Sequence, residues 1–427
     1  MTFYRNLAET AVSLGWSVQV IEGSAFSVFD TATQETINGV SVEGLESARL
    51  ERWAARFHHL AASPSVQKML AAAWAAREQS AQHGPFDLVE ATEFGLLHVP
   101  YILESTSPVV VQCHAGWGQI GLYDPTGGKE FDQALALAIE TEGLRHASAR
   151  HTSADANASW WERQGAGPFA VIRPCWHPPS ETLAGEMIDG VIRVFGRIQA
   201  WKGPDVVAKA WSAAPELPDI NWHGRDVATD SRGGSTCAAL KAAYSDVWGS
   251  RIRPQPTVPP VEVAQLQARA LLNLVPSTWD VFNFTAVEAM SSGRPAVCSD
   301  KAGASELIED GRTGFVYDGS SPTALIDAIR RALALSPEQL ACIGKNGRDS
   351  VLDLLNPERQ ARAHLEAYEA ALAAPKPAPD VLPAWFRTIA LPRAPARVTS
   401  NYLDQYPLRD LVAYVIERSA RKARIKL

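Results

Sequence analysis

Two acidic side chains, Asp280 and Glu288, flank the predicted start of a helix in the segment WDVFNFTAVEAMSSGRP. One interpretation is structural, because Thr285 and Glu288 fit the S/T-x-x-E pattern of a capping box. The other is that the backbone N–H groups of Phe284 and Thr285, at the positive end of the helix, bind a phosphate. Carboxylates repel phosphate, so the two acids would then hold hydroxyl groups. A ligand with central phosphates and hydroxyl-bearing groups at both ends is a nucleotide sugar.

A basic pair, Arg197 and Lys202, lies in the segment FGRIQAWKGP, directly after an apolar strand-like run. Gly196 and Gly203 in the same segment allow a close approach of the backbone to a ligand. The pair is either solvated surface charge or a diphosphate site, in which arginine supplies a fork of donors and lysine a point charge.

These residues must be positioned by strands that alternate with helices along most of the chain. Such alternation predicts parallel sheets made of βαβ units, in two series that face each other across a cleft. We place the boundary in the proline-rich segment 174–181. The predicted strands are 17–22, 87–90, 109–113, 170–173, 191–196, 220–223, 270–275, 295–299 and 314–317, and the clearest early helices are 3–14 and 131–146.

With these segments the chain resembles the family-4 retaining glycosyltransferases of GT-B fold. FGRIQAWKG is similar to the G-R-x-x-x-x-K-G segment of that family, and DVFNFTAVE to its E-x7-E segment. The later run SDKAGASELIEDGRTGFV resembles the S-x-x-G-G-x-x-E-L-I-x-D-G-x-T-G-F-L motif. The three motifs occur in family order across residues 190–335.

The resemblance implies roles for individual residues. Arg197 and Lys202 would bind the donor diphosphate, Glu288 the ribose, and Asp280 the hydroxyl groups of the donor sugar. Two positions depart from the family: Asp280 is one methylene shorter than the usual glutamate, and Asn283 stands where the family has glycine.

In the N-terminal half, VVQCHAGWG resembles the strand-then-histidine segment in which a histidine faces donor sugar and acceptor. His114 is therefore a candidate catalytic residue beside Asp280, the alternative being a structural hydrogen-bonding histidine. Glu90 and Glu93, in DLVEATE, either line the acceptor side or are ordinary polar loop residues.

Composition narrows the class of partner. With 46% hydrophobic and 20% charged residues the chain has the composition of a globular protein, and a formal net charge of -7 argues against nucleic acid. The five scattered cysteines contain no CxxC pair and suggest neither a disulfide framework nor a zinc site. No apolar run reaches the roughly 20 residues that span a bilayer, so we expect a cytoplasmic protein.

Both ends of the chain carry unusual features. The first predicted helix begins almost at Met1, so the strand expected before it is missing from this sequence. Either translation starts upstream, which we favour, or the chain has lost a strand and one donor-binding loop. Near the other end, 375–379 (PKPAP) is a predicted linker. Leu408, Leu411, Val412, Val415 and Ile416 then form an apolar stripe followed by basic residues, which predicts packing across the two domains or a weaker peripheral contact with anionic lipid.

The sequence thus predicts an α/β fold of two Rossmann-like domains, 1–175 and 176–373, followed by a linker and helical tail, 374–427. The expected activity is retaining sugar transfer from a nucleotide-diphosphate donor to a hydroxyl acceptor in polysaccharide, glycolipid or glycoconjugate synthesis. No cofactor and no metal are expected, and because the chain contains no D-x-D motif a metal-bridged diphosphate is not predicted. A nucleotide-sugar 2-epimerase of related fold and a catalytically silent nucleotide-sugar-binding subunit remain alternatives.

Overall fold

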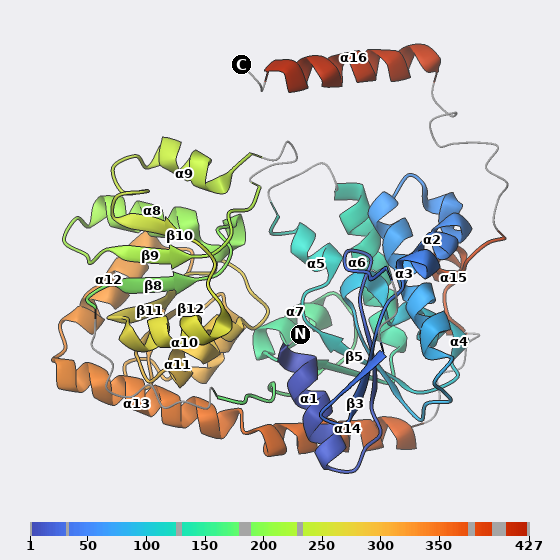
Figure 1. The fold of residues 1–427 in the computed structure, drawn as a ribbon, viewed down its shortest axis with the longest axis horizontal. Helices are drawn as coiled ribbons and strands as arrows, with labels where there is room; N and C mark the ends of the chain where they lie inside the picture. The colour runs from blue at the N-terminus through green and yellow to red at the C-terminus, as the bar shows by residue number, and fades with distance from the viewer. Residues whose placement is uncertain are drawn as a thin grey trace.

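The computed structural model describes residues 2–30, 34–124, 130–178, 189–228, 234–374, 381–394 and 407–424. Its two halves lie side by side, each with a parallel sheet between helices (Figure 1). The α/β fold class predicted from the sequence is therefore confirmed. The exact domain limits stay a prediction, and residues 179–181 of the predicted boundary and the predicted linker 375–379 lie outside the described residues.

The C-terminal half contains one six-stranded sheet in the order β10-β9-β8-β11-β12-β13, with every neighbouring pair parallel. The chain order reverses between β8 and β11, which makes this the point where an open α/β sheet forms its binding crevice. The strands are β8 (Ile192–Phe195), β9 (Ile220–His223), β10 (Ile252–Gln255), β11 (Leu272–Val275), β12 (Ala296–Ser299) and β13 (Phe315–Tyr317).

Buried runs explain why these segments form central strands. All side chains of β11 and β12 are buried, as expected for strands covered by helices on both faces. The covering helices are α8 (Pro204–Ala213), α9 (Thr236–Ala243), α10 (Pro260–Arg269), α11 (Phe284–Ser291) and α12 (Pro322–Leu333), with short 3-10 turns η3 (Ala200–Lys202) and η4 (Gly303–Leu307) at strand ends.

The N-terminal half has two sheets rather than the single parallel sheet that the sequence suggested. One has the order β4-β5-β6-β7 and is parallel, and the other has the order β1-β3-β2 with β2 antiparallel to β3. The strands are β1 (Gln19–Glu22), β2 (Gln34–Ile37), β3 (Val40–Gly44), β4 (Val89–Thr92), β5 (Val109–Cys113), β6 (Ala149–Thr152) and β7 (Ala170–Val171). The exposed, polar β2 carried no apolar signal in the sequence.

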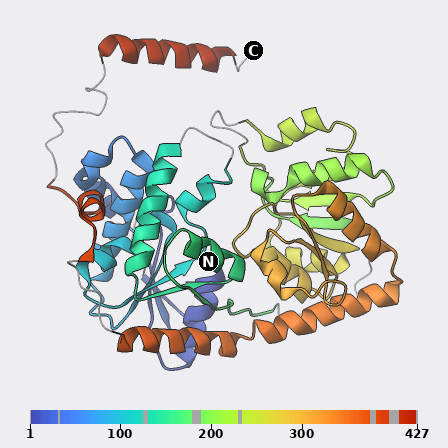
Figure 2. The ribbon, with the colours of Figure 1, turned by 180° about the vertical axis from the view of Figure 1, so that it is seen from behind.

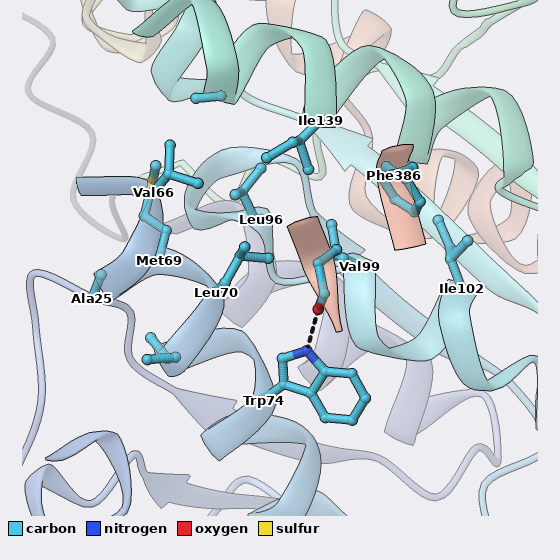
Figure 3. Close-up of a cluster of buried hydrophobic side chains, with 14 of the residues drawn as sticks. Ala25, Val66, Met69, Leu70, Trp74, Leu96, Val99, Ile102, Ile139 and Phe386 are labelled. Carbon is cyan, nitrogen blue, oxygen red and sulfur yellow. Dashed lines mark hydrogen bonds between the residues drawn. The ribbon is translucent and has the colours of Figure 1, made fainter. Parts of the chain in front are cut away.

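The helices of this half are α1 (Thr2–Ser13), α2 (Ser47–Ala54), α3 (Pro64–Ser80), α4 (Val99–Glu104), α5 (Trp117–Gly121), α6 (Glu130–His146) and α7 (Asp155–Arg163), with 3-10 turns η1 (Ala55–Leu60) and η2 (Phe94–Leu96). The buried side chains of α1 lie in two smaller clusters, and the other helices pack around one apolar core. Phe386, from α15 (Ala384–Ala390), is fully buried in this core, and the indole N–H of Trp74 donates to the Ala390 carbonyl at 3.0 Å (Figure 3).

Two consecutive helices join the halves on one side of the molecule. α13 (Pro337–Leu354) packs on α11 of the C-terminal half, and α14 (Pro357–Ala373) packs on α1, β5 and β6 of the N-terminal half. They form a continuous strip beneath both sheets in the two views (Figures 1 and 2). The sequence analysis expected the C-terminal tail to pack across the two halves, but α13 and α14 do so instead.

The tail helix α16 (Leu408–Arg424) lies apart from the rest of the protein in both views (Figures 1 and 2). Its apolar side chains, among them Leu408 and Ile416, are exposed rather than packed across the domains, so that interpretation was wrong. Within the described residues, no helix combines the length and apolar character needed to cross a bilayer.

Close backbone contact at the crevice generates a first prediction. Gly203 has a φ of 76°, and a Cβ there would lie 1.9 Å from the Pro276 carbonyl oxygen, at the loop after β11. Gly203→Ala should therefore lower the free energy of unfolding by about 1–3 kcal/mol, measured by chemical denaturation. Gly311→Ala is the matched control, because Gly311 has a φ of 75° and no atom within 4 Å of the point where its Cβ would lie. Equal losses in the two variants would contradict the close approach of the loops.

Candidate donor site at the sheet crevice

The predicted basic loop and the predicted acidic loop meet at the crevice between β8 and β11. The Lys202 ammonium donates to the Asp280 carboxylate, and both side chains are mostly shielded from solvent. The Thr278 N–H donates to the Trp201 carbonyl at 2.9 Å, which fastens the two loops together. The structure thus brings together two residues that are 78 positions apart in the sequence.

Arg197 lies on the same loop as Lys202 but is exposed. Its guanidinium lies 6.0 Å from the centre of the Trp201 ring. Desolvation and the nearby positive charge of Arg225 lower the pKa of Arg197, while Asp280 acts in the opposite direction. Two arginines that repel each other beside an open crevice create a local preference for an anion.

A pocket of about 470 Å³ opens beside these arginines. It lies at the carboxyl ends of β8, β9 and β10, where a parallel sheet presents its ligand site. Phe195 and His223 stack in its wall with ring centroids 5.0 Å apart. The pocket is lined by Phe195, Gly196, Arg197, His223, Gly224, Arg225, Thr257, Val258 and Val263.

The start of α11 corrects the capping-box interpretation. Asn283, not Thr285, is the N-cap: its side-chain oxygen accepts from the Thr285 N–H at 3.0 Å. Because that N–H is already bonded, it is not the free phosphate donor that the sequence suggested. The Phe284 N–H makes no hydrogen bond within the described part of the chain and remains the candidate.

The backbone conformation of Asn283 explains why asparagine can stand where the family pattern has glycine. Its φ is 75°, a left-handed conformation that glycine adopts freely and that asparagine tolerates better than most residues. Its side-chain N–H donates to the Ser277 hydroxyl at 3.1 Å. Asparagine therefore keeps the turn while adding a cap to the helix.

Glu288 projects from the second turn of α11 and is half-buried. Burial raises the pKa of its carboxyl to about 7. Its carboxylate makes no hydrogen bond or ion pair with the described residues, so it does not serve as the reciprocal half of a capping box. A shielded acceptor without a protein partner suits a ligand hydroxyl.

His114 lies on the opposite half, after β5, and no contact joins it to Asp280 in the described structure. Its imidazole packs against Phe3 and Tyr4 of α1, with ring centroids 4.7 and 5.2 Å away. Burial lowers the pKa of His114 to about 4, so the ring is neutral near pH 7, and its Nε2 has no partner among the described residues.

Glu93 supports the loop that carries His114. Its buried carboxylate accepts the backbone N–H groups of His114 and Ala115, each at 2.8 Å. Ala115 has a φ of 135°, which L-residues rarely adopt, and the two hydrogen bonds hold it there. Glu90 instead accepts from the Tyr368 hydroxyl. Both acids thus make structural bonds, but neither is the ordinary polar loop residue of the plainer interpretation, because Glu90 is on β4 and Glu93 is fully buried.

Contacts between the halves border the site. Trp279, the residue before Asp280, stacks on Tyr123 of the N-terminal half, with ring centroids 4.3 Å apart and planes within 7°. Glu306 accepts the N–H groups of Asp155 and Ala156 at 2.9 Å, at the N-terminus of α7, where a negative charge is favoured. Sequence reasoning missed these contacts because each joins distant segments. Arg225 could have been found, since it closely follows a predicted strand end.

Each half of the chain matches a known protein family. Residues 2–176 match the family described as glycosyl transferase 4-like domain, and residues 188–350 match glycosyl transferases group 1. The chain belongs to the family-4 glycosyltransferases of GT-B fold. The family resemblance seen in the sequence motifs is confirmed.

Solved structures share this glycosyltransferase fold. Sucrose-phosphate synthase from Thermosynechococcus elongatus is 21% identical, with a TM-score of 0.67 over 87% of this chain and 93% of that one. HepE of Anabaena, in complex with UDP and glucose, is 19% identical, with a TM-score of 0.54 over 68% of this chain and 80% of that one.

A curated relative matches a shorter region. A D-inositol 3-phosphate glycosyltransferase of Acidothermus cellulolyticus is 30% identical over 172 residues. The match covers 38% of this chain and 38% of that relative's own length.

The shielded Glu288 generates a second prediction. A nucleotide sugar whose hydroxyls donate to this carboxylate should bind more tightly as pH rises through about 7, because ionisation strengthens the acceptor. Calorimetric titration between pH 6 and 8 measures the effect. Glu288→Gln should bind more weakly and lose this pH dependence. An identical pH profile in the variant would contradict the assignment.

Proposed function

We propose that this chain is a retaining glycosyltransferase that moves a sugar from a nucleotide-diphosphate donor to a hydroxyl acceptor. The observation that carries the proposal is the pairing of Lys202 with Asp280 at the crevice where β8 and β11 are neighbours. A cation beside a carboxylate at this place suits the junction between the phosphates and the hydroxyl-bearing sugar of a donor.

The proposed donor spans the crevice. Its nucleoside occupies the pocket of about 470 Å³ beside Arg197 and Arg225, with the ribose hydroxyls on Glu288. The diphosphate contacts Arg197, Lys202 and the Phe284 N–H at the positive end of α11. On donor binding Lys202 exchanges its bond to Asp280 for one to a phosphate, which leaves Asp280 free to accept from the donor sugar.

The chemical step transfers the anomeric carbon from a phosphate oxygen to the acceptor oxygen. As the glycosidic bond to phosphate breaks, negative charge grows on the departing diphosphate, and the Arg197 and Lys202 cations stabilise it. The acceptor approaches on the face of the leaving phosphate, which takes the acceptor proton, so that anomeric configuration is retained. In this proposal no metal ion is required at the diphosphate.

The acceptor is assigned only by class. We propose a hydroxyl group of a glycan, lipid or small molecule, presented by the N-terminal half with His114 facing the donor sugar. The curated relative named above acts on an inositol phosphate, and HepE binds UDP and glucose, which makes UDP-glucose the first donor to test. The exposed stripe of α16 supports, as a further proposal, a peripheral contact with anionic lipid.

Donor screening followed by product analysis tests the function. We expect one of the UDP-, GDP-, ADP- or dTDP-sugars to stabilise the protein, by about 2.7 kcal/mol at 100 times its Kd. With an acceptor, NMR should then detect a new glycoside of retained configuration and free nucleoside diphosphate. Isomerisation of the donor without an acceptor would indicate an epimerase instead. Binding without release of nucleoside diphosphate, across many acceptors, would indicate a silent binding subunit.

Lys202 gives the third prediction. Lys202→Ala should lower kcat by roughly 10²–10³, because it removes a preorganised charge from the leaving diphosphate. The matched control is Lys209→Ala, since Lys209 is half-exposed on α8 and forms its ion pair with Asp205 on the same helix. Steady-state kinetics on both variants measures the effect. Near-normal turnover in Lys202→Ala would refute the role.

A further inference from the structure

Three side chains from distant segments converge beneath the N-terminal sheet. Glu90 is on β4, His151 on β6 and His364 on α14. The strand register pairs Thr92 with Gln112 and Gln112 with His151, so Glu90, two positions before Thr92, lies on the same face as His151. α14 packs on β5 and β6 and covers this face.

The spacing of these side chains suits a single ion. One ligand atom from each of Glu90, His151 and His364 lies within 4.8 Å of the other two. The two imidazole rings have centroids 5.7 Å apart. A tetrahedral zinc ion holds its nitrogen and oxygen ligands roughly 3.3 Å apart, so small side-chain rotations close the site.

The polar atoms of the cluster lack protein partners. His364 is completely buried, and neither ring nitrogen has a hydrogen bond among the described residues. The same holds for Nδ1 of His151 and Oε1 of Glu90. A buried polar atom without a partner is destabilising, and each neutral imidazole has one lone pair that a bound ion would satisfy.

Neighbouring groups complete the arrangement. The Tyr368 hydroxyl donates to the second carboxylate oxygen of Glu90 and orients it, as outer partners of metal-binding carboxylates do. Gln112, fully buried and next to His151 in register, has an unpartnered side-chain oxygen that could supply a fourth ligand.

The pKa shifts of the two histidines agree with this geometry. Burial lowers the pKa of His151 to about 4 and that of His364 to about 3, so both rings are neutral near pH 7 and have a lone pair to offer. Burial raises the pKa of Glu90 to about 7, although the Tyr368 hydrogen bond opposes the shift. No Lys or Arg contributes to that pKa among the described residues, so the carboxylate lacks a nearby positive charge.

We propose that Glu90, His151 and His364 bind one divalent transition-metal ion, for which Zn²⁺ is the best match. Two imidazoles and one carboxylate suit zinc, whereas Mg²⁺ and Ca²⁺ prefer all-oxygen sites. The ion fastens α14 to the N-terminal sheet close to His114, since the Phe3 ring contacts both His114 and His364. It is structural and takes no part in holding the donor diphosphate.

Metal titration of the full-length protein tests the proposal. After chelator treatment, Co²⁺ is followed by its visible absorption and Zn²⁺ by calorimetry. We expect one tight site per chain, weakened at least about tenfold in His364→Gln and in His151→Gln. His58→Gln is the matched control, because His58 is exposed and its loss should leave the affinity unchanged. Equal affinity in His364→Gln and the unaltered protein, or no binding at one ion per chain, overturns the proposal.

A second measurement uses the unaltered protein, so its result does not depend on whether the variants fold. X-ray absorption of the zinc-loaded chain should report two imidazoles, oxygen ligands and no sulfur. A sulfur ligand, or a shell without imidazole, overturns the site. The result does not depend on glycosyl transfer, so failure of the metal site and failure of the proposed function are distinguishable.

Discussion

The close approach of the loops after β8 and β11 is the constraint on which the site depends. These strands are neighbours although β9 and β10 separate them in the chain, so their carboxyl ends open into one crevice. Gly203 lets the first loop lie against the Pro276 carbonyl, and Lys202 then reaches Asp280. Without that contact, the basic and acidic segments would be two unrelated surface loops.

The helix start in the second loop combines a structural role with a proposed role in donor binding. Asn283 caps α11 from a left-handed conformation, which fixes both the Phe284 N–H and, one turn later, Glu288. The residue that departs from the family pattern thus preserves the geometry of the turn. Asp280 differs in another way, because Lys202 engages its shorter side chain, and the proposed contact with the donor sugar requires that this ion pair is broken.

Much of the fold could be predicted from the sequence, since buried strands such as β5 and β12 are short, mostly apolar runs at the predicted positions. Local motifs likewise predicted Arg197, Lys202 and Glu288 as site residues, and their roles stay predictions. Contacts between distant segments could not be predicted: the exposed β2 has no apolar signal, and the Glu306 cap on α7 joins residues 150 positions apart. The cluster of His151 and His364 was missed for the same reason, because histidines so far apart in the chain form no local ligand motif.

The direct test of the account is a crystal structure of the protein with the nucleotide sugar that stabilises it most. We expect the diphosphate to contact Arg197, Lys202 and the Phe284 N–H. The ribose should hydrogen-bond to Glu288 and the donor sugar to Asp280. We also expect the bond between Lys202 and Asp280 to be broken in the complex. A nucleotide bound outside the crevice between β8 and β11, or one with its base against Asp280, would contradict the account.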